Sequence, residues 1–374
     1  MTLMLSANSH WNIVNFREQL VDALVAAGHR LHLAAPGADA EWARAHGADA
    51  IDIAIDRSGL NPFADAALGL DYLRLFRRLK IDCFLGFTAK PNIYGSLAAQ
   101  LCGTISLPNV SGLGTAFIGD GLLSRIVALL YRLAFHGCPI VFFQNPDDRD
   151  LFVAKKIVRS EQTRVLPGSG IDLDYFRPEP VPAGDEKRFL FIGRLLGDKG
   201  VREFVEAARQ LRTGRPGWRF QLLGDLDPGN RTGIGRGEVD QWVGEGLVEH
   251  LGHVDDIRPF IGAATAVVLP SYREGLPRSL LEGAAMARPL VASDVPGNRQ
   301  LVEHGINGLL CEARSARSLA EAMRVLGSMD SARRAEMGGA SRALVEREYC
   351  VERVIEAYLD ALAQLAGGAG VRTA

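Results

Sequence analysis

The sequence contains few cysteines, and their arrangement suggests neither a disulfide framework nor a metal site. The five cysteines are scattered along the chain, and none belongs to a Cys-x-x-Cys pair. An odd number of cysteines without paired spacing argues against a small secreted scaffold and against structural zinc.

Segments that would direct the chain to or across a membrane are also missing. The first residues lack a basic start followed by an apolar stretch of about 7 to 15 residues, the pattern of a signal peptide. No uncharged apolar run reaches the roughly 18 residues that a transmembrane helix needs. We therefore expect a cytoplasmic protein.

No charge of one sign dominates the chain. Forty-two basic residues face 44 acidic ones, which leaves a formal net charge of -2. This balance offers no global attraction to nucleic acid. With 47% hydrophobic and 23% charged residues, the composition is that of a compact soluble protein. A length of 374 residues favours two domains of about 180 residues each over one core.

Short aliphatic runs alternate with longer helical patterns along the whole sequence, which predicts an α/β fold built twice. The expected strands are 3–5, 31–35, 51–55, 83–86, 105–107, 140–143 and 164–166, then 189–192, 220–223, 248–251, 266–269, 290–292 and 308–310. Strands this apolar are buried on both faces, as in a parallel sheet. We therefore expect two Rossmann-like, doubly wound domains that face a cleft at the carboxyl ends of their strands.

A polar stretch with three prolines, residues 172–187, has the composition of a linker. The expected N-terminal domain is 1–175 and the expected C-terminal domain is 176–350. A last helix, 351–366, follows the final strand, and we expect it to cross back to the first domain.

The strongest local motif opens the second half. Strand 189–192 leads into Gly193-Arg194-Leu-Leu-Gly-Asp-Lys199-Gly200, and a helix is expected from about residue 201. A guanidinium fork, a point charge and free N–H groups at a helix start suit a diphosphate. A solvated turn with two surface cations is the alternative.

A second motif, Glu274-Gly-Leu-Pro-Arg-Ser-Leu-Leu-Glu282, follows strand 266–269. Pro277 suits a first helical turn, so the peptide N–H groups of Gly275 and Leu276 should lie just before the helix. Two carboxylates placed in this way can bind hydroxyls on two parts of an extended ligand, such as a sugar and a ribose. The alternative is that Glu274 caps the helix and Glu282 is a surface charge.

Together these motifs resemble the retaining glycosyltransferases of family 4, which have the GT-B fold. Further similarity points to the branch that extends undecaprenyl-diphosphate-linked sugars in capsular-polysaccharide and lipid-linked-oligosaccharide assembly. The segments that carry it are 58–62 (Ser-Gly-Leu-Asn-Pro), 88–95 (Thr-Ala-Lys-Pro-Asn-Ile-Tyr-Gly), Thr115, 143–148 (Phe-Gln-Asn-Pro-Asp-Asp), 167–172 (Pro-Gly-Ser-Gly-Ile-Asp) and 224–229 (Gly-Asp-Leu-Asp-Pro-Gly).

Carried over by position, the resemblance implies that Arg194, Lys199 and Glu274 are the catalytic residues. The two cations would bind the donor diphosphate and stabilise the charge on the leaving group, while Glu274 would bind hydroxyls of the transferred sugar. Glu282 would bind the ribose, and the loop at His253 would lie beside the nucleobase. The full donor-binding set is Gly193, Arg194, Lys199, His253, Val254, Glu274, Gly275, Leu276 and Glu282.

The resemblance further implies a UDP-sugar donor, an N-acetylhexosamine or hexose as the sugar, and a polyprenyl-diphosphate-linked acceptor. It implies retention at the anomeric carbon, with the donor phosphate taking the acceptor proton and no protein base. No cofactor or metal is expected, because two cations are already assigned to the diphosphate. Mg²⁺ held by Asp172 and Asp174, or by Asp225 and Asp227, is the alternative; both pairs are better explained as turn residues.

The first domain departs from the family pattern at two places. A Gly-Gly pair is common after the first strand, where this chain has Ala7-Asn8-Ser9-His10, and a histidine is common where it has Phe87-Thr88-Ala89-Lys90. The candidates for the acceptor or for other first-domain contacts are therefore Asn8, His10, Thr88, Lys90 and Thr115.

Residues 119–136 form an unusually apolar helical pattern with two arginines on the other side, Arg125 and Arg132. Such a helix either packs against a sheet or lies in a membrane interface. Basic residues at 74, 77, 78 and 80 could add attraction to anionic lipid. A lipid-linked acceptor makes peripheral contact with the inner face of the cell membrane a reasonable hypothesis.

Other functions remain as alternatives. A nucleotide-sugar epimerase on the same fold would release a rearranged or free sugar without an acceptor, and the acceptor of a transferase could be non-lipid. A Rossmann dehydrogenase is disfavoured because no Gly-x-Gly-x-x-Gly follows the first strand. A non-catalytic sugar-binding module would not need Arg194, Lys199 and Glu274 together.

Overall fold

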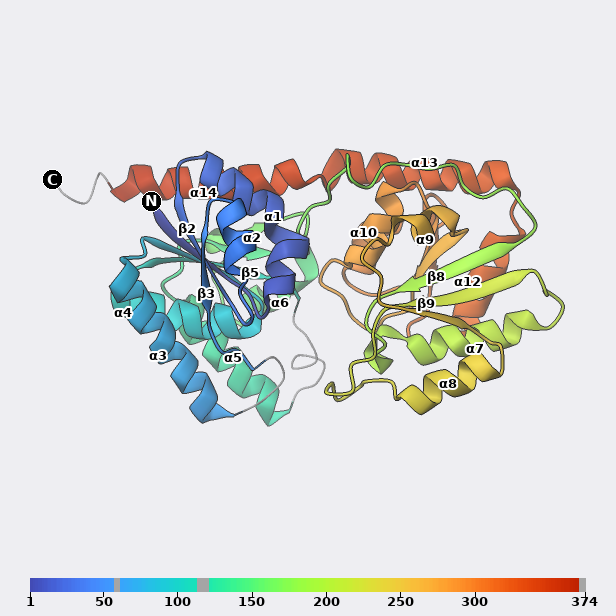
Figure 1. Ribbon diagram of the computed structural model, residues 1–374, viewed down its shortest axis with the longest axis horizontal. Helices are drawn as coiled ribbons and strands as arrows, with labels where there is room; N and C mark the ends of the chain where they lie inside the picture. The colour runs from blue at the N-terminus through green and yellow to red at the C-terminus, as the bar shows by residue number, and fades with distance from the viewer. Residues whose placement is uncertain (57–60, 113–120, 370–374) are drawn as a thin grey trace. The chain divides into compact units, whose positions relative to one another are not determined.

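The computed structural model describes residues 1–56, 61–112 and 121–369 of the chain. They form two compact units, one made of Met1–Gly170 with the chain from Val351 onward, the other of Ile171–Cys350. Figure 1 shows a separate sheet in each unit. The first boundary thus lies at Gly170, a few residues before the one expected at 175.

The first unit is a parallel sheet of seven strands in the order β3-β2-β1-β4-β5-β6-β7. Its strands are β1 Thr2–Ser6, β2 Arg30–Ala35, β3 Asp49–Asp52, β4 Cys83–Phe87, β5 Ile105–Val110, β6 Val141–Phe143 and β7 Thr163–Val165. Its helices are α1 His10–Ala26, α2 Ala40–Ala45, α3 Pro62–Leu79, the π-helical turn η1 Pro91–Gly95, α4 Ser96–Cys102, α5 Leu122–Phe135, α6 Pro146–Ala154, the 3₁₀ turn η3 Ser160–Gln162 and α14 Val351–Ala369. The reversal of strand order beside β1 and β4 makes this a doubly wound sheet.

The second unit repeats the plan with six parallel strands in the order β10-β9-β8-β11-β12-β13. Its strands are β8 Lys187–Ile192, β9 Trp218–Leu223, β10 Glu249–Gly252, β11 Ala266–Leu269, β12 Leu290–Ser293 and β13 Gly308–Cys311. Its helices are the 3₁₀ turn η4 Gly197–Lys199, α7 Val201–Arg212, α8 Arg236–Gly244, α9 Arg258–Ala263, α10 Arg278–Ala285, α11 Asn298–Leu301, α12 Ala316–Ser328 and α13 Ser331–Glu348. All of β11 and β12 is buried, which agrees with the expected sheet covered on both faces.

The last helix, α14, packs on the first unit. Tyr358 is fully buried there; its ring centroid lies 4.7 Å from that of Phe142, and its hydroxyl accepts a hydrogen bond of 2.9 Å from Asn109 Nδ2. In Figure 1 this helix, in red, runs beside the strands that begin the chain. The chain therefore crosses to the second unit after Gly170 and returns at Val351.

The proline-rich stretch expected as a linker is fixed to the second unit by arginines. Arg288 is fully buried and donates to the carbonyls of Glu179 and Pro180. Burial lowers the pKa of Arg288 to about 10, and Glu179 acts in the opposite direction. Arg342 donates to the carbonyl of Phe176 at 2.8 Å. Because a guanidinium has five donors, backbone carbonyls can satisfy it. The stretch is a bound strap and not a solvated spacer.

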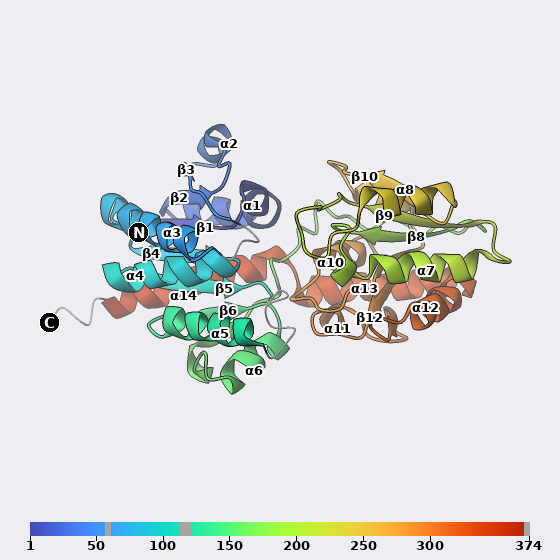
Figure 2. The ribbon, with the colours of Figure 1, turned by 90° about the horizontal axis from the view of Figure 1, so that it is seen from below.

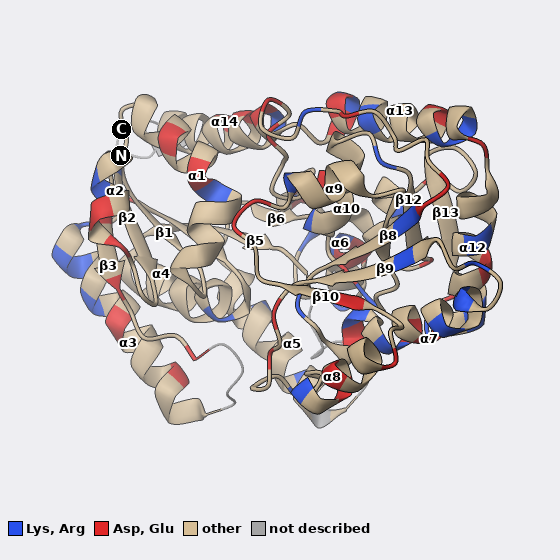
Figure 3. Cartoon of the chain, turned by 45° about the vertical axis from the view of Figure 1, so that its right-hand side comes forward, with Lys and Arg blue, Asp and Glu red and all other residues tan. Residues whose placement is uncertain are grey.

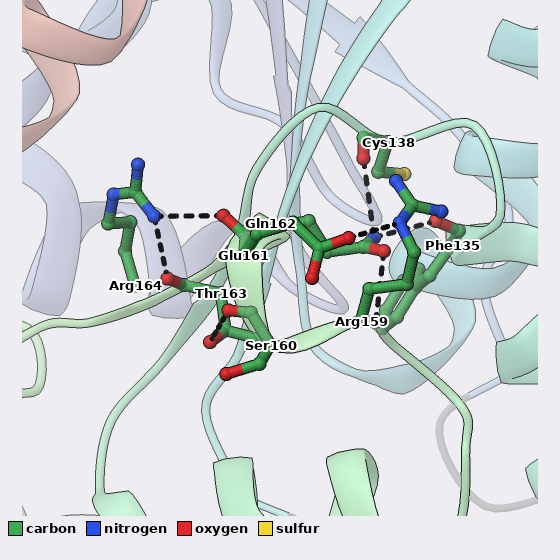
Figure 4. A network of polar contacts seen from close by, with 8 residues as sticks. All are labelled: Phe135, Cys138, Arg159, Ser160, Glu161, Gln162, Thr163 and Arg164. Carbon is green, nitrogen blue, oxygen red and sulfur yellow. Dashed lines mark hydrogen bonds and ion pairs between the residues drawn. The ribbon is translucent and has the colours of Figure 1, made fainter.

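A polar network fixes the C-terminal end of α5 to the sheet edge (Figure 4). Gln162 Nε2 donates to the carbonyls of Phe135 and Cys138 at 3.0 and 3.3 Å, and its Oε1 accepts from the N–H of Arg159. Gln162 ends η3, which leads directly into the edge strand β7. The amide thus holds the helix end in place.

Candidate functional site

One edge of the second sheet collects the residues that the two motifs singled out. Parallel strands have their carboxyl ends at a common edge, and β10, β9, β8 and β11 are consecutive neighbours. The residues that follow these four strands are His253 and Val254 after β10, Asp225 and Asp227 after β9, Gly193, Arg194 and Lys199 after β8, and Glu274, Gly275 and Leu276 after β11.

The two motifs meet in a single ion pair. Lys199 Nζ lies 2.6 Å from Glu274 Oε1, and the two side chains are 27% and 10% exposed. Lys199 ends η4 and is followed by Gly200, the N-cap of α7. A solvated turn with unrelated surface cations therefore does not describe Lys199. The ammonium and the carboxylate share one partly buried place at the end of the sheet.

Close backbone packing brings the two loops together. Gly200 has a φ of 73°, and a Cβ built there would lie 2.1 Å from the carbonyl oxygen of Pro270. Tyr272 N–H donates to Asp198 O at 2.9 Å, and the Tyr272 hydroxyl donates to Glu203 Oε1 at 2.6 Å. Burial and the neighbouring Glu203 carboxylate raise the pKa of Tyr272 to about 12, so the phenol remains a donor at neutral pH. Glycine is required at position 200 because only it allows this approach.

The Glu274 loop is supported from its other side by the end of β12. Gly297 has a φ of 84°, and a Cβ there would lie 2.7 Å from the Glu274 carbonyl oxygen. Ser293 Oγ donates to the carbonyl of Ser271, and Asn298 Nδ2 donates to Ser293 O at 2.9 Å. The loop that carries Gly275 and Leu276 is thus held between α7 and α11.

Glu282 is a buried acid and not the surface charge that was one alternative. It lies in α10 with 8% of the residue exposed, and Arg278 Nε donates to its Oε1 at 2.9 Å. Burial raises the pKa of Glu282, and the charge of Arg278 acts against that shift. Pro277 is the N-cap of α10, so Gly275 and Leu276 lie just before the helix, as expected. A buried carboxylate in the helix that follows the Glu274 loop has the oxygens to accept hydrogen bonds from hydroxyl groups.

Arg194 has an acidic partner that the sequence did not reveal. Its Nη1 lies 2.7 Å from Asp227 Oδ2 in the loop after β9. The neighbouring Asp225 faces His253, with Oδ2 3.3 Å from Nδ1. These two acids were interpreted as turn residues, an interpretation that misses their side-chain contacts with Arg194 and His253. It does describe Asp172, whose Oδ1 accepts from the N–H groups of Asp174 and Tyr175.

The two candidate residues in the loop after β10 differ in their exposure to solvent. The His253 side chain is 59% exposed, whereas Val254 packs against the hydrophobic core of the unit. Gly252, with a φ of 68°, precedes them, and its carbonyl accepts from Gly224 N–H at 2.9 Å. His253 therefore presents an exposed ring at the sheet edge, while the side chain of Val254 faces the core.

The candidates in the first unit lie at the corresponding edge of its own sheet. Asn8 and His10 follow β1, and Thr88 and Lys90 follow the adjacent β4. Thr88 has a φ of 68°, and its Oγ1 is buried with no hydrogen-bond partner among the described residues. His10 begins α1 and stands edge-on to Trp42, at 5.4 Å between ring centroids.

Lys90 is engaged in a mostly buried ion pair. Its Nζ lies 2.6 Å from Asp65 Oδ1, and the side chains are 16% and 14% exposed. Tyr94 donates to the other carboxylate oxygen at 3.0 Å. This arrangement joins α3 to the turn after β4, so it has a structural role whatever else Lys90 contacts. Thr115 and residues 58–60 lie outside the described residues.

The second-unit site has the groups needed to bind an anion beside a polyhydroxylated ligand. Lys199, Arg194 and the start of α7 provide positive charge and N–H donors, while Glu274 and Glu282 provide acceptors. Across the described ranges, no cluster of three or more His, Cys, Asp or Glu residues is placed to hold a metal ion.

Two protein families match the chain. The family described as "Glycosyl transferase 4-like domain" matches residues 13–168, and the one described as "Glycosyl transferases group 1" matches residues 186–328. Together they span most of the sequence, one in each unit.

Relatives of known activity cover much of the same length. The N,N'-diacetylbacillosaminyl-diphospho-undecaprenol alpha-1,3-N-acetylgalactosaminyltransferase of Campylobacter jejuni is 26% identical over 336 residues, which are 84% of this chain and 86% of the relative. The UDP-Gal:alpha-D-GlcNAc-diphosphoundecaprenol alpha-1,3-galactosyltransferase of Escherichia coli is 26% identical over 267 residues, which are 67% of each chain.

Among solved structures, sucrose-phosphate synthase from Thermosynechococcus elongatus is similar over nearly the full length. The TM-score is 0.82 at 20% sequence identity, with 98% of this chain and 100% of that chain covered. At this level of identity the likeness shows a common fold and carries no information on the substrate.

Proposed function

Because the chain belongs to the group 1 glycosyltransferases and has their GT-B fold, we propose that it moves a sugar from a UDP-sugar to a polyprenyl-diphosphate-linked saccharide. The names of two relatives support this choice of substrates. Both act on undecaprenyl-diphosphate-linked sugars, and one uses UDP-Gal. We propose an N-acetylhexosamine or hexose as the sugar, used in assembly of a bacterial surface polysaccharide or glycoprotein glycan.

The pairing of Lys199 with Glu274 carries the proposal. A cation suited to a phosphate and a carboxylate suited to sugar hydroxyls lie within one hydrogen bond of each other. A UDP-sugar presents a diphosphate directly beside a sugar ring, so it can engage both groups at once. Neither group alone would distinguish a sugar nucleotide from a simple nucleotide. Arg194, on the same loop as Lys199, is the second cation proposed for the diphosphate.

In the proposed reaction the acceptor hydroxyl oxygen forms a bond to the anomeric carbon. The bond from that carbon to the donor phosphate oxygen breaks, the acceptor proton moves to that phosphate, and UDP leaves. Lys199 and Arg194 would stabilise the negative charge that grows on the departing diphosphate. We infer retention of configuration from the family resemblance. The anomeric configuration of the product, measured by NMR, tests this inference.

We also propose that transfer needs no metal. Two side-chain cations supply the charge that Mg²⁺ would otherwise bring to a diphosphate. Activity should persist in EDTA; a loss of transfer that added Mg²⁺ restores would contradict this proposal.

We further propose that the first unit contacts the inner face of the cell membrane. No helix within the described ranges has the length and hydropathy to cross a bilayer. One face of α5 packs inward through Tyr131 and Phe135. Of the two alternatives for this helix, packing inside the protein therefore describes that face alone. The other face exposes large apolar side chains, each 42% to 53% accessible: Leu123, Ile126, Leu129 and Leu133.

Basic residues flank this apolar face. Helices α3, α4 and α5 lie side by side in both views of the ribbon (Figures 1 and 2), and most of α5 is uncharged (Figure 3). The exposed basic residues are Arg74, Arg77 and Arg78 on α3, Lys80 at its C-cap, and Arg125 and Arg132 on α5. Apolar side chains with surrounding positive charge suit a bilayer that contains anionic lipid.

A transfer assay tests the proposed function. The chain is incubated with UDP-sugars and an undecaprenyl-diphosphate-linked saccharide, and the products are separated. We expect a lengthened lipid-linked saccharide and one UDP for each sugar transferred. Acceptor-independent conversion of the UDP-sugar to a rearranged sugar nucleotide would instead favour an epimerase, and transfer only to a soluble glycan would favour a non-lipid acceptor.

A further inference from the structure

We propose that Asp227 is a competing anion at the donor site, whose carboxylate must release Arg194 when a diphosphate binds. This role rests on the proposed function, because it takes Arg194 as a diphosphate ligand. It assigns to Asp227 a part in the balance between donor binding and product release. Neither the donor motif nor the acid pair Glu274 and Glu282 includes this residue.

The contact joins the ends of two neighbouring strands. Arg194 comes directly after Gly193 at the end of β8, and Asp227 lies in the loop after β9. The distance from Nη1 to Oδ2 is 2.7 Å, and the side chains are 60% and 29% exposed. A guanidinium with a carboxylate on one edge has fewer donors left for a phosphate fork. An incoming diphosphate therefore meets a cation that is already paired.

The backbone around Asp227 is fixed, so only its side chain can move away. Leu195 N–H donates to Asp225 O at 2.9 Å, and Ile234 N–H donates to Leu195 O at 2.9 Å. Asn230 N–H donates to the carbonyl of Asp227 itself at 3.0 Å. These bonds tie the β9–α8 loop to the β8–α7 loop on both sides of the acid. Asp227 can thus leave Arg194 by side-chain rotation while its backbone stays in place.

Charge repulsion predicts that the Asp227 carboxylate weakens diphosphate binding. A carboxylate next to the phosphate-binding guanidinium disfavours any bound diphosphate, by an amount that salt reduces. The repulsion is larger for the product than for the donor. Transfer of the sugar frees a terminal phosphate oxygen, and a terminal phosphate has a further ionisation near pH 6. UDP is therefore more negative than the UDP-sugar at neutral pH, and Asp227 favours its departure.

A role in holding Arg194 in its binding geometry makes the opposite prediction. If Asp227 only orients the guanidinium, its removal frees a flexible side chain and weakens diphosphate binding. If Asp227 competes, its removal strengthens binding, and strengthens it more for UDP than for the UDP-sugar. The sign of the change in affinity thus separates the two roles.

The experiment is a calorimetric titration of UDP into the full chain, comparing the wild type with Asp227→Asn. We expect the Kd for UDP to fall about three- to tenfold in low salt, and the gain to shrink as salt rises. Asp227→Ala should show the same sign. Glu206→Gln breaks another 2.7 Å carboxylate–arginine pair of the same unit, on the solvent-facing side of α7, and should leave the Kd unchanged.

Arg194→Ala supplies the test of mechanism. In that background the gain from Asp227→Asn should shrink, because competition for the guanidinium is gone and only direct repulsion between the carboxylate and the diphosphate remains. An undiminished gain without Arg194, or an unchanged or weaker Kd in Asp227→Asn, would overturn the role of Asp227 alone. Failure of the wild type to bind UDP would overturn the proposed donor site, and this role with it.

Discussion

Lys199 and Glu274 lie 75 positions apart in the chain, yet their charged atoms are 2.6 Å apart. The pair forms because Gly200 packs directly on the Pro270 carbonyl, which brings the end of η4 to the start of the Glu274 loop. The glutamate side chain is only 10% exposed, so it depends on this partner. The two residues that we propose to bind the donor thus also hold each other in place between the two loops.

Replacing Glu274 should impair sugar transfer without weakening the binding of UDP. We expect Glu274→Gln to lower kcat/KM for transfer about 100-fold, because a neutral amide is a weaker acceptor for sugar hydroxyls. The Kd for UDP, which has no sugar, should not weaken, since Lys199 loses a competitor. Steady-state kinetics and calorimetry measure the two effects. Glu321→Gln, at an exposed pair on α12, is the matched control. Equal losses for UDP and for transfer would contradict the assigned sugar contact.

The buried acid in α10 should make stability depend on pH. Because burial raises the pKa of Glu282, the folded protein binds this proton more tightly than the unfolded chain does. Between the ordinary pKa of 4.5 and the raised folded value, stability should therefore fall as pH rises. At pH values above the raised pKa, Glu282 is ionised in the folded protein, and its buried charge lowers the free energy of unfolding by the full amount.

Glu282→Gln should remove this decline. We expect the variant to have a higher Tm than the wild type near neutral pH, and no such advantage below pH about 4. UDP affinity should fall about tenfold, because the ribose loses a charged acceptor. Thermal melts across pH and calorimetric titration measure both. A Tm difference that does not change with pH would show that the carboxylate titrates normally.

Two glycines with similar backbone angles allow a matched test of the loop contact. Gly200 and Gly214 have φ values of 73° and 87°, but only a Cβ at Gly200 would meet another atom, the Pro270 carbonyl. Gly214→Ala should lower stability by about 1 kcal/mol through backbone strain alone. Gly200→Ala should cost about 2 kcal/mol more and reduce transfer, because it pushes Lys199 from Glu274. Denaturant melts measure this difference; equal losses would mean that the loops are not in contact.

Much of the fold could be predicted because apolar runs report buried strands directly. Seven strands were expected in the first half and six in the second, and each overlaps a strand of the structure. The two motifs around Lys199 and Glu274 were also visible, since each follows a strand and precedes a helix. Their spacing along the chain, together with parallel topology, places them at one sheet edge.

Side-chain pairing between loops could not be predicted in the same way. Asp227 and Lys90 find partners across different elements, Arg194 and Asp65, and no local pattern specifies which charge meets which. The strap at 172–187 resembles a linker in sequence, because prolines and polar residues are compatible both with a solvated linker and with an extended segment bound to a domain. The guanidinium groups of Arg288 and Arg342, far along the chain, show that it is bound.

The exposed face of α5 should determine binding to lipid. We expect Ile126→Ser with Leu129→Ser to lower flotation of the protein with anionic liposomes about tenfold, because each substitution removes an apolar side chain from the bilayer interface. Ile306→Ser is the control, since Ile306 of the second unit is exposed to the same 48% as Ile126. Equal flotation of the folded double variant and the wild type would remove α5 as the contact.

The affinity of the chain for UDP relative to uridine tests the central claim most directly. If Arg194 and Lys199 hold a diphosphate, the wild type should bind UDP at least about 100-fold more tightly than uridine. This preference should collapse when both cations are replaced by alanine in a protein that still melts cooperatively. A preference that survives unchanged in the folded double variant would contradict the account, because the diphosphate would then be bound elsewhere.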